Sequence, residues 1–364
     1  MFLTNRAGHG TISMTHAMEV SSVTLQELRA LRIHRQHLTA PAEALTVVRD
    51  LCGLQCQFLS CALHALRIRT GQPFSPEGLV KNWTLRGTVH LFAESDLPLF
   101  LSHDGRQTIA EDGFHHWRTG ALLIAPERYR RFCETVLAQV AQGNDTRAGL
   151  KEICAAEGMT EKEADAFFDP WGGGLRDLCQ RGLLNHRLQE KKAFMPCPPF
   201  TPLPEDDARQ ELLRRYLFHA GPATLRDASY FFAWPQTELR QRMERLGARE
   251  VQVDGGRCFF LGDLPGDVPE APACVLLAGF DQLLLSYQKL DGVFLDAAHL
   301  RGIFSLAGIV HPAMMLRGQV AGRWQRKGSR VTFQPFRVLS PQEKRSVTEA
   351  MERCMDDVKR VVWD

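Results

Sequence analysis

Two glutamines, Gln55 and Gln57, are the residues of this chain whose type and spacing could do chemistry. They follow Gly53, a residue typical of helix ends, and Cys56 stands between them. In an extended backbone, residues two positions apart point to the same side, so both amides would face one place while Cys56 turns into the core. An amide oxygen accepts a hydrogen bond from water and turns negative partial charge toward a cation, although it is a poor general base. The alternative interpretation is a solvated polar loop beside a helix end.

The elements that must position this pair belong to a unit that recurs along the chain. In its first copy, at about 22–95, helices are expected over 24–37 and 41–52, before the glutamines, and over Leu59–Ile68 after them. The stretch Trp83–Phe92 then predicts a strand. The glutamines therefore fall in a connector between two helices.

The clearest copy lies at 205–262. A helix over about 207–220 is broken by Gly221-Pro222, and Thr224–Asp227 has the pattern of a capping box that opens a second helix. The third helix is expected to turn one set of side chains inward, Leu239, Met243 and Leu246, and another outward, Arg240, Arg242 and Arg245. The turn Asp254–Gly256 then predicts a hairpin. Three helices followed by a hairpin form a winged helix, and Arg240 and Arg242 on its third helix are candidates for DNA contact.

A further copy is expected at about 128–197, with helices over 147–157 and 175–181 before its strands. Its three glycines, 172–174, predict a flexible turn between helices. A phosphate-binding loop is not favoured, because no Lys-Ser/Thr pair follows the glycines.

The chain changes character beyond Pro269, where a meander of short strands over 314–333 and a helix over about 342–361 are expected. The predicted fold class is therefore mainly α with β wings (α+β), with three tandem winged-helix units around a concave cleft and a C-terminal β-rich region that carries a basic hairpin. The predicted divisions are a disordered lead-in at 1–21, winged-helix units at 22–126, 127–203 and 204–268, and the C-terminal region at 269–364.

Composition describes a protein with an ample core, since 44% of its 364 residues are hydrophobic and 24% are charged. No apolar run approaches the roughly 20 residues that a bilayer requires, and no export signal is recognisable, so we expect a cytoplasmic, nucleoid-acting protein that does not contact membranes. The true start could be Met14 or Met18. Three of the ten cysteines, Cys52, Cys56 and Cys61, are close together, but their spacing matches no metal motif. We expect reduced thiols, no metal site and no cofactor.

The net charge of +2 does not by itself indicate a nucleic-acid partner. The meander, however, carries five basic residues and no acidic one between positions 317 and 330. They are Arg317, Arg323, Arg326, Lys327 and Arg330. A basic hairpin of this kind could follow a phosphate backbone, because affinity for DNA comes mainly from phosphate neutralisation. The alternative is a solvated ribbon that serves solubility.

Five separated stretches together resemble one family. They are Leu51–Gln57, Trp83–Leu91, Gly221–Asp227, Leu277–Leu284 and Gly308–Trp324. They are similar to the tandem winged-helix DNA glycosylases of the AlkZ/YcaQ type, which excise alkylated purines and unhook interstrand crosslinks. The resemblance extends over nearly the whole chain from about residue 22.

The resemblance implies that Gln55 and Gln57 carry the catalysis. The double-glutamine form belongs to members associated with resistance to a bulky crosslinking natural product, whereas a Gln–apolar–Asp form belongs to the broader alkylpurine branch. The implied partner is double-stranded DNA that carries alkylated purines, and we expect a monomer. Arg86 and His90 are candidates to support the glutamines or to contact DNA, and His90 could instead be a core histidine.

The family also inserts a β-hairpin into DNA. The matching segment here is the ribbon from about Gly308 to Trp324, and His311 and Pro312 at its start are candidates to probe the duplex. The family often has an arginine near the position of Lys289, so a backbone contact at that place is in doubt.

Amides are adequate for one kind of excision. A purine alkylated at N7 is already cationic, so it leaves without a proton, and its departure creates oxocarbenium character at the sugar. Holding a water and placing negative dipoles around the sugar then suffices. The function expected is a monofunctional glycosylase for cationic N7-alkylpurines, including bulky adducts and crosslinks. The alternatives are a winged-helix transcription regulator without catalysis and a protein-interaction scaffold.

Overall fold

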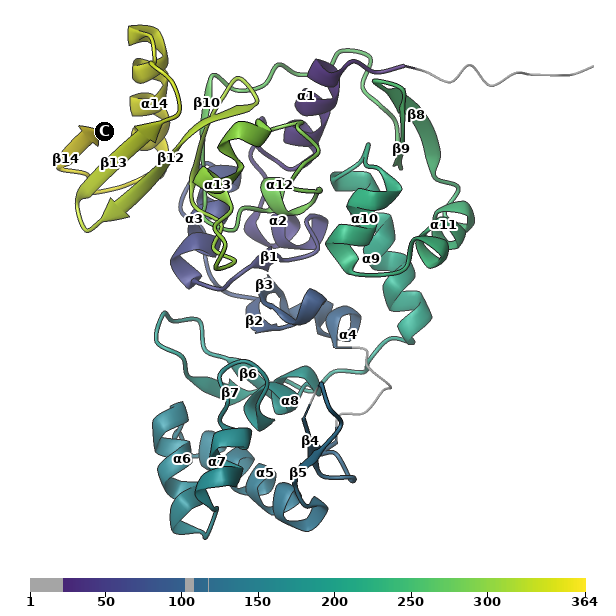
Figure 1. The fold of residues 1–364 in the computed structure, drawn as a ribbon, viewed down its shortest axis with the longest axis vertical. Helices are drawn as coiled ribbons and strands as arrows, with labels where there is room; N and C mark the ends of the chain where they lie inside the picture. The colour runs from purple at the N-terminus through teal and green to yellow at the C-terminus, as the bar shows by residue number, and fades with distance from the viewer. Residues whose placement is uncertain (1–21, 102–107, 117) are drawn as a thin grey trace, which may run out of the picture.

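The computed structural model describes residues 22–101, 108–116 and 118–364, so the lead-in expected at 1–21 lies outside the described residues. The described chain is a mixed α/β protein (Figure 1). The N-terminal helices, the helices after residue 204 and the first C-terminal strands gather in the upper part of the view, and residues from about 108 to 196 form the lower part.

The N-terminal elements largely follow the predicted order. They are α1 (Leu25–Arg35), α2 (Ala44–Asp50), β1 (Leu54–Gln55), α3 (Leu59–Thr70), β2 (Leu79–Trp83), β3 (Val89–Ala93) and α4 (Leu97–Phe100). The prediction of one strand over Trp83–Phe92 is wrong, because a 3-10 turn over Leu85–Gly87 separates β2 from β3. Arg86 and Gly87 both have left-handed backbone there, with φ of 53° and 65°, and this turn reverses the chain into an antiparallel pair.

A five-stranded sheet carries the glutamine segment, in the order β1-β3-β2-β6-β7, with β6 at Leu184–His186 and β7 at Phe194–Pro196. Gln55 lies opposite His90 and His90 lies opposite Asn82, so these side chains share one face. The other face packs against α2 and α3. Because β2 pairs with β6, the sheet crosses the expected boundary at 126/127.

The lower part of the molecule has its own core, which includes Tyr129, Phe132 and Phe167. Its elements are β4 (Phe114–His115), β5 (Leu122–Ile124), α5 (Pro126–Ala141), α6 (Arg147–Ala156), α7 (Glu161–Phe167) and α8 (Gly174–Gln180). Gly172 and Gly173 form a turn before α8, as predicted, and Gly174 is the first residue of this helix. A Cβ on Gly173 would lie 2.3 Å from the carbonyl oxygen of Phe167, so close packing of two backbones requires glycine at this position.

Residues 205–262 match the predicted three helices and hairpin. They form α9 (Glu205–His219), α10 (Leu225–Phe232), α11 (Gln236–Arg245), β8 (Arg249–Val253) and β9 (Gly256–Phe260). The expected outward position of Arg242 is wrong. Its side chain is buried and forms ion pairs with Asp206 at 2.8 Å and Glu238 at 2.9 Å, because α11 packs this side against α9. Arg240 is exposed.

The C-terminal region centres on a second five-stranded sheet, ordered β10-β11-β12-β13-β14. Its elements are β10 (Cys274–Leu277), α12 (Gln282–Leu285), α13 (Leu300–Ile303), β11 (Ala313–Leu316), β12 (Gln319–Lys327), β13 (Arg330–Pro335), α14 (Pro341–Cys354) and β14 (Arg360–Trp363). The predicted helix over 342–361 is wrong at its end. It stops at Cys354, and the β-prone Val-Val-Trp stretch pairs in parallel with β13. Across the described ranges, no helix combines the length and apolar character of a membrane span.

Candidate active site

The backbone of the glutamine segment is extended at Gln55 and Cys56. Gln55 ends β1, and the amide of Cys56 continues the ladder with a 2.7 Å hydrogen bond to the carbonyl of Val89. Cys56 is fully buried, as predicted, while Gln55 and Gln57 are half-buried. The chain then bends at Gln57 and Phe58 and enters α3. The rigid ladder and the helix therefore hold the pair from both sides.

Arg86 is the residue that touches the amide of Gln55. Its guanidinium donates to the Gln55 Oε1 at 3.4 Å and to the carbonyl of Phe231, and lies 5.0 Å from the centre of the Phe231 ring. Burial lowers the pKa of Arg86. The arginine thus links the β2–β3 turn, α10 and the side chain of Gln55.

His90 is not placed to contact DNA. Its side chain is completely buried, and Nδ1 lies 2.9 Å from the hydroxyl of Thr84. Burial, with the charge of Arg86, lowers the pKa of His90 to about 3, so the ring is neutral at physiological pH. The DNA-contact hypothesis for His90 is therefore withdrawn, and the alternative of a core histidine holds.

Helix α3 begins beside Gln57 without a capping side chain of its own. The carboxylate of Glu190, in the β6–β7 loop, accepts a 2.5 Å hydrogen bond from the amide of Ser60 in the first turn of the helix. A carboxylate suits this place because the helix N-terminus is electropositive. No local signal in the sequence shows that Glu190 would reach residue 60.

The segment around α12 braces α3 from behind. Asp281 forms a bidentate pair with Arg69, at 2.8 and 3.0 Å, and both side chains are 0% exposed. The neighbouring Gln282 donates a 2.9 Å hydrogen bond to the carbonyl of Leu51, just before the glutamine segment. These contacts join residues more than 200 positions apart. The sequence therefore shows that Leu277–Leu284 resembles a family motif but does not show that it packs against α3.

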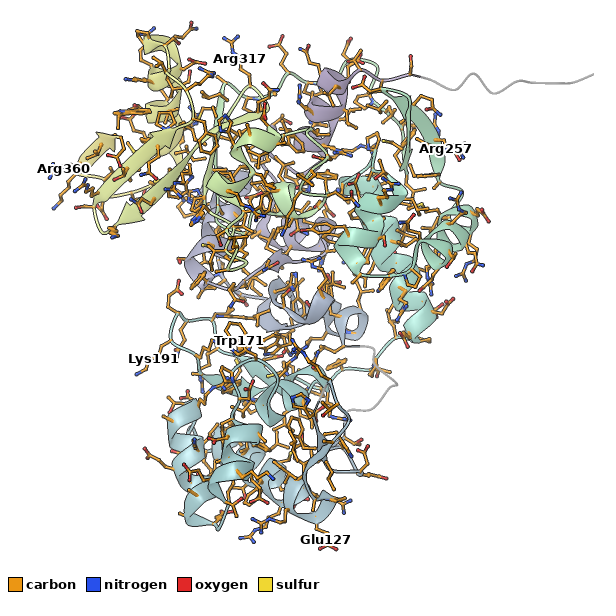
Figure 2. All side chains as sticks on the ribbon, in the orientation of Figure 1. Glu127, Trp171, Lys191, Arg257, Arg317 and Arg360 are labelled. Atoms are coloured by element: carbon orange, nitrogen blue, oxygen red, sulfur yellow. The ribbon has the colours of Figure 1, made fainter. Side chains whose placement is uncertain are left out.

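A pocket of about 370 Å³ lies next to Arg86. Its lining residues are Arg86, Gly87, Phe114, His115, Gly172, Gly173, Arg176, Asp177 and Gln180. Arg176 lies over the ring of Trp83 at 4.8 Å and donates to the carbonyl of Trp171, whose side chain is labelled in Figure 2 and 66% exposed. Cationic groups and an exposed aromatic ring therefore lie together near the glutamine segment.

The five basic residues of the C-terminal ribbon do not form one patch. Arg317 lies in the turn between β11 and β12, ten residues from Lys327, so along an extended strand they are about 30 Å apart. Arg323 is half-buried and donates to Gln334 at 2.6 Å. Instead, β14 places Arg360 opposite Arg330. Figure 2 shows Arg317 and Arg360 at separate ends of the C-terminal region.

The basic cluster is therefore the β12–β13 turn with the start of β14. It consists of Arg326, Lys327, Arg330, Lys359 and Arg360. Arg326 donates to the carbonyls of Gly328 and Asp356, and Lys359 donates its amide to the carbonyl of Ser329. The sequence missed the last two members because it predicted a helix there.

His311 and Pro312 are half-buried and lead into β11, whose four residues are all buried. Burial, with Arg323, lowers the pKa of His311. Just before them, Phe304 bridges to Val310, and Leu306 between these two residues is 87% exposed. Beyond them, β11 and β12 are central strands of the sheet. The DNA-probing role of His311 and Pro312 stays a prediction.

The thiols near the glutamines are not reactive. Burial raises the pKa of Cys52 and of Cys56 to about 12, and raises that of Cys61, so all three are protonated at neutral pH. Within the described ranges, one group of side chains has the geometry to hold a metal ion, and it consists of His37, Asp50 and His219.

Comparison with known proteins identifies the family of this chain. The Interstrand DNA cross-link repair glycosylase of Streptomyces sahachiroi is 28% identical over 365 residues, which cover 92% of this chain and 95% of that protein. The solved structure of Streptomyces sahachiroi DNA glycosylase AlkZ matches with a TM-score of 0.71 at 25% identity, covering 94% of this chain and 100% of that one. A family model described as DNA glycosylase AlkZ-like matches residues 48–356. The chain therefore belongs to the AlkZ-like DNA glycosylase family and is a DNA glycosylase.

Proposed function

We propose that this enzyme hydrolyses the N-glycosidic bond of cationic N7-alkylated purines in double-stranded DNA, including bulky adducts and interstrand crosslinks, and that Gln55 and Gln57 position the attacking water. The observation that carries the proposal is the amide of Gln55, held at the end of a strand by Arg86 at 3.4 Å. The Streptomyces sahachiroi relative is an interstrand DNA cross-link repair glycosylase, which supports a crosslinked substrate for this enzyme. The biological role that we propose is DNA repair or self-resistance to a genotoxin.

The chemistry follows from the groups at the site. An amide oxygen has two lone pairs, so Gln55 can accept from Arg86 with one and from water with the other. The neutral ring of His90 adds no charge next to the developing oxocarbenium ion. Because the leaving purine is cationic, its departure neutralises it and needs no general acid. The reaction then depends on orientation and dipoles, which a fixed amide supplies.

The proposed DNA surface extends from the glutamines along α3. Phe58 precedes this helix, and Arg67 near its far end lies 3.9 Å from Asp356, beside the basic cluster. Nine helical residues span about 13 Å, less than half a turn of B-DNA. Lys327, Arg330 and Arg360 could therefore neutralise phosphates of a duplex whose lesion is at Gln57. The exposed Leu306, with His311 and Pro312 shortly after it, would then probe that duplex.

The helix-and-hairpin units at 22–126, 127–203 and 204–268 are interpreted as three winged helices that hold a monomeric enzyme around one concave DNA cleft. Such a clamp differs from a transcription regulator, which typically brings one winged helix per subunit to a palindrome. Membership in a glycosylase family disfavours the regulator. A substrate of chromosomal DNA would place the enzyme in the cytoplasm.

The direct test measures release of free base from a duplex with N7-methylguanine and from an N7-linked interstrand crosslink. Gln55→Ala and Gln57→Ala should each lower the single-turnover rate by about 10²-fold or more, because each removes a positioned polar group. The matched control is Gln72→Ala, an exposed glutamine just beyond α3, which should leave the rate unchanged.

Retention of more than about a tenth of the rate by both alanine variants would refute the catalytic assignment. Sequence-selective binding without base release would favour a regulator, and DNA affinity that does not fall with salt would favour an interaction scaffold. A preference for the crosslink over N7-methylguanine would support the double-glutamine branch.

A further inference from the structure

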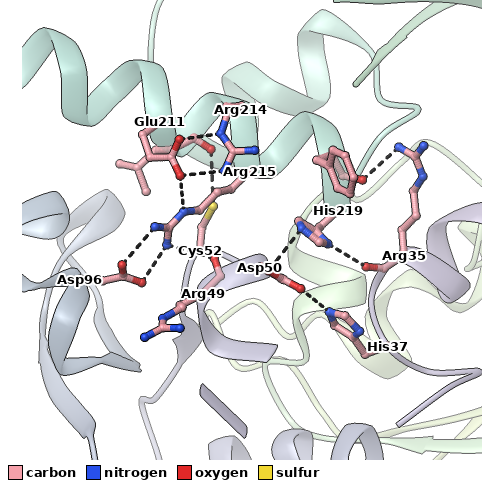
Figure 3. A network of polar contacts seen from close by, with 12 residues as sticks. Arg35, His37, Arg49, Asp50, Cys52, Asp96, Glu211, Arg214, Arg215 and His219 are labelled. Atoms are coloured by element: carbon pink, nitrogen blue, oxygen red, sulfur yellow. Dashed lines mark hydrogen bonds and ion pairs between the residues drawn. The ribbon is translucent and has the colours of Figure 1, made fainter. Parts of the chain in front are cut away.

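Two histidines, His37 and His219, converge on the carboxylate of Asp50 (Figure 3). Asp50 Oδ2 lies 2.7 Å from Nε2 of His37, and Asp50 Oδ1 lies 3.3 Å from Nε2 of His219. All three ligand atoms lie within 4.8 Å of one another. Each side chain is about one-fifth exposed, so an ion could enter and keep a water ligand. Around a tetrahedral zinc ion, ligand atoms are about 3.4 Å apart, a separation that small ring rotations would reach.

Both ring nitrogens of His219 face acceptors. Its Nδ1 lies 3.4 Å from the carbonyl oxygen of Arg35, and its Nε2 lies 3.3 Å from a carboxylate oxygen of Asp50. A neutral imidazole has one N–H, so it can donate to only one of them. A metal ion bound at Nε2 would leave the N–H at Nδ1 to donate to Arg35.

The fold places these groups at helix ends. Asp50 and His219 are the last residues of α2 and α9, and His37 follows the end of α1. Helix C-termini carry negative partial charge, which favours a cation. His37 has a φ of 60° at a position where glycine is usual, and a non-glycine residue in this conformation carries strain.

We propose that His37, Asp50 and His219 form a binding site for a divalent transition-metal ion of the zinc class. Two imidazoles and one carboxylate suit Zn²⁺ or Co²⁺ better than Ca²⁺ or Mg²⁺, which prefer oxygen ligands. The carbonyl of Arg35 holds the His219 ring as an outer partner of the ligand. Asp50 stands five residues before Gln55, so the ion would tie three helix ends to the start of the glutamine segment. The site revises the expectation of no metal and does not depend on the lesion.

The test uses the untagged full-length protein, stripped with a chelator and titrated separately with Zn²⁺ and Co²⁺. One equivalent of Zn²⁺ should bind and, at about 100 times its Kd, raise the melting temperature by roughly 3 to 4 °C. Co²⁺ should show the visible absorption of a nitrogen and oxygen site. His219→Asn and His37→Asn should each weaken binding at least ten-fold, as expected for loss of one ligand.

The control is His299→Asn, because this histidine stacks on Phe336 outside the cluster, and it should leave binding unchanged. Circular dichroism checks that each variant is folded, and the wild-type titration decides the question even if a variant is not. The proposal fails if neither ion binds stoichiometrically, if binding survives in both histidine variants, or if cobalt shows the intense charge-transfer absorption of thiolate ligands. The last outcome would point to Cys52 or its neighbours.

Discussion

Removal of the Asp281 carboxylate should destabilise this enzyme strongly. Asp281→Ala eliminates the hydrogen bonds of 2.8 and 3.0 Å to Arg69, which is 0% exposed and keeps only the carbonyls of Gln36 and Ala65 as acceptors. An uncompensated buried charge costs about 3–5 kcal/mol. Loss of the cap that Asp281 provides to the amide of Leu283 adds about 1 kcal/mol. We therefore expect the free energy of unfolding to fall by about 4–6 kcal/mol.

Urea denaturation followed by circular dichroism measures this loss. The double variant Arg69→Met/Asp281→Ala should be less damaged than the sum of its single variants by at least about 2 kcal/mol, because it leaves no unpaired charge. Asp263→Ala is the control, since the 2.9 Å pair of Asp263 with Arg249 is 97% and 56% exposed and its loss should not change stability measurably.

The functional consequence of the same change is a loosened glutamine segment. Gln282, adjacent to Asp281, donates to the carbonyl of Leu51, so disorder in this stretch should lower base release at temperatures where the variant is still folded. Two results would refute the pairing. One is a free energy of unfolding of the Asp281→Ala variant within about 1 kcal/mol of the wild-type value. The other is a loss of stability in the double variant that equals the sum of the losses in the two single variants.

Three further predictions concern positioning, pH and salt. Arg86→Met should lower kcat about ten-fold or more with little change in KM, and Arg86→Lys should not restore it, because one ammonium cannot serve both Phe231 and the Gln55 amide. His186 is buried, neither ring nitrogen has a hydrogen-bond partner among the described residues, and burial, with nearby cations, lowers its pKa to about 3. The unfolded chain binds a proton at His186 more readily than the folded chain does. The stability that depends on the neutral ring is therefore complete above about pH 6.5 and falls by about 1.4 kcal/mol per pH unit below it. Urea denaturation at pH 7 and pH 5 should show that His186→Phe makes the loss of stability between these two pH values smaller by about 2 kcal/mol. Lys327→Ala should reduce the slope of log affinity against log salt by about 0.9 in DNA-binding titrations, and an unchanged slope would contradict the phosphate contact.

Local signals explain what the sequence could determine. The capping box at Thr224 involves atoms three residues apart, and the helix begins there as predicted. The turn at Asp254–Gly256 joins β8 to β9, and the alternation through Gln55 and Cys56 predicts both the extended connector and the buried thiol. In each case the interaction energy is confined to neighbours, so the residue types suffice.

Only the tertiary structure decided which distant groups meet. Arg242 has the spacing of an outward residue, but α9 supplies Asp206 and buries it. Arg69 and Asp281 are 212 positions apart, and Asp50 and His219 are 169 apart, so their contacts depend on how whole helices pack. A sequence pattern records the energy of neighbours along the chain, whereas these pairs gain theirs from burial that exists only after folding.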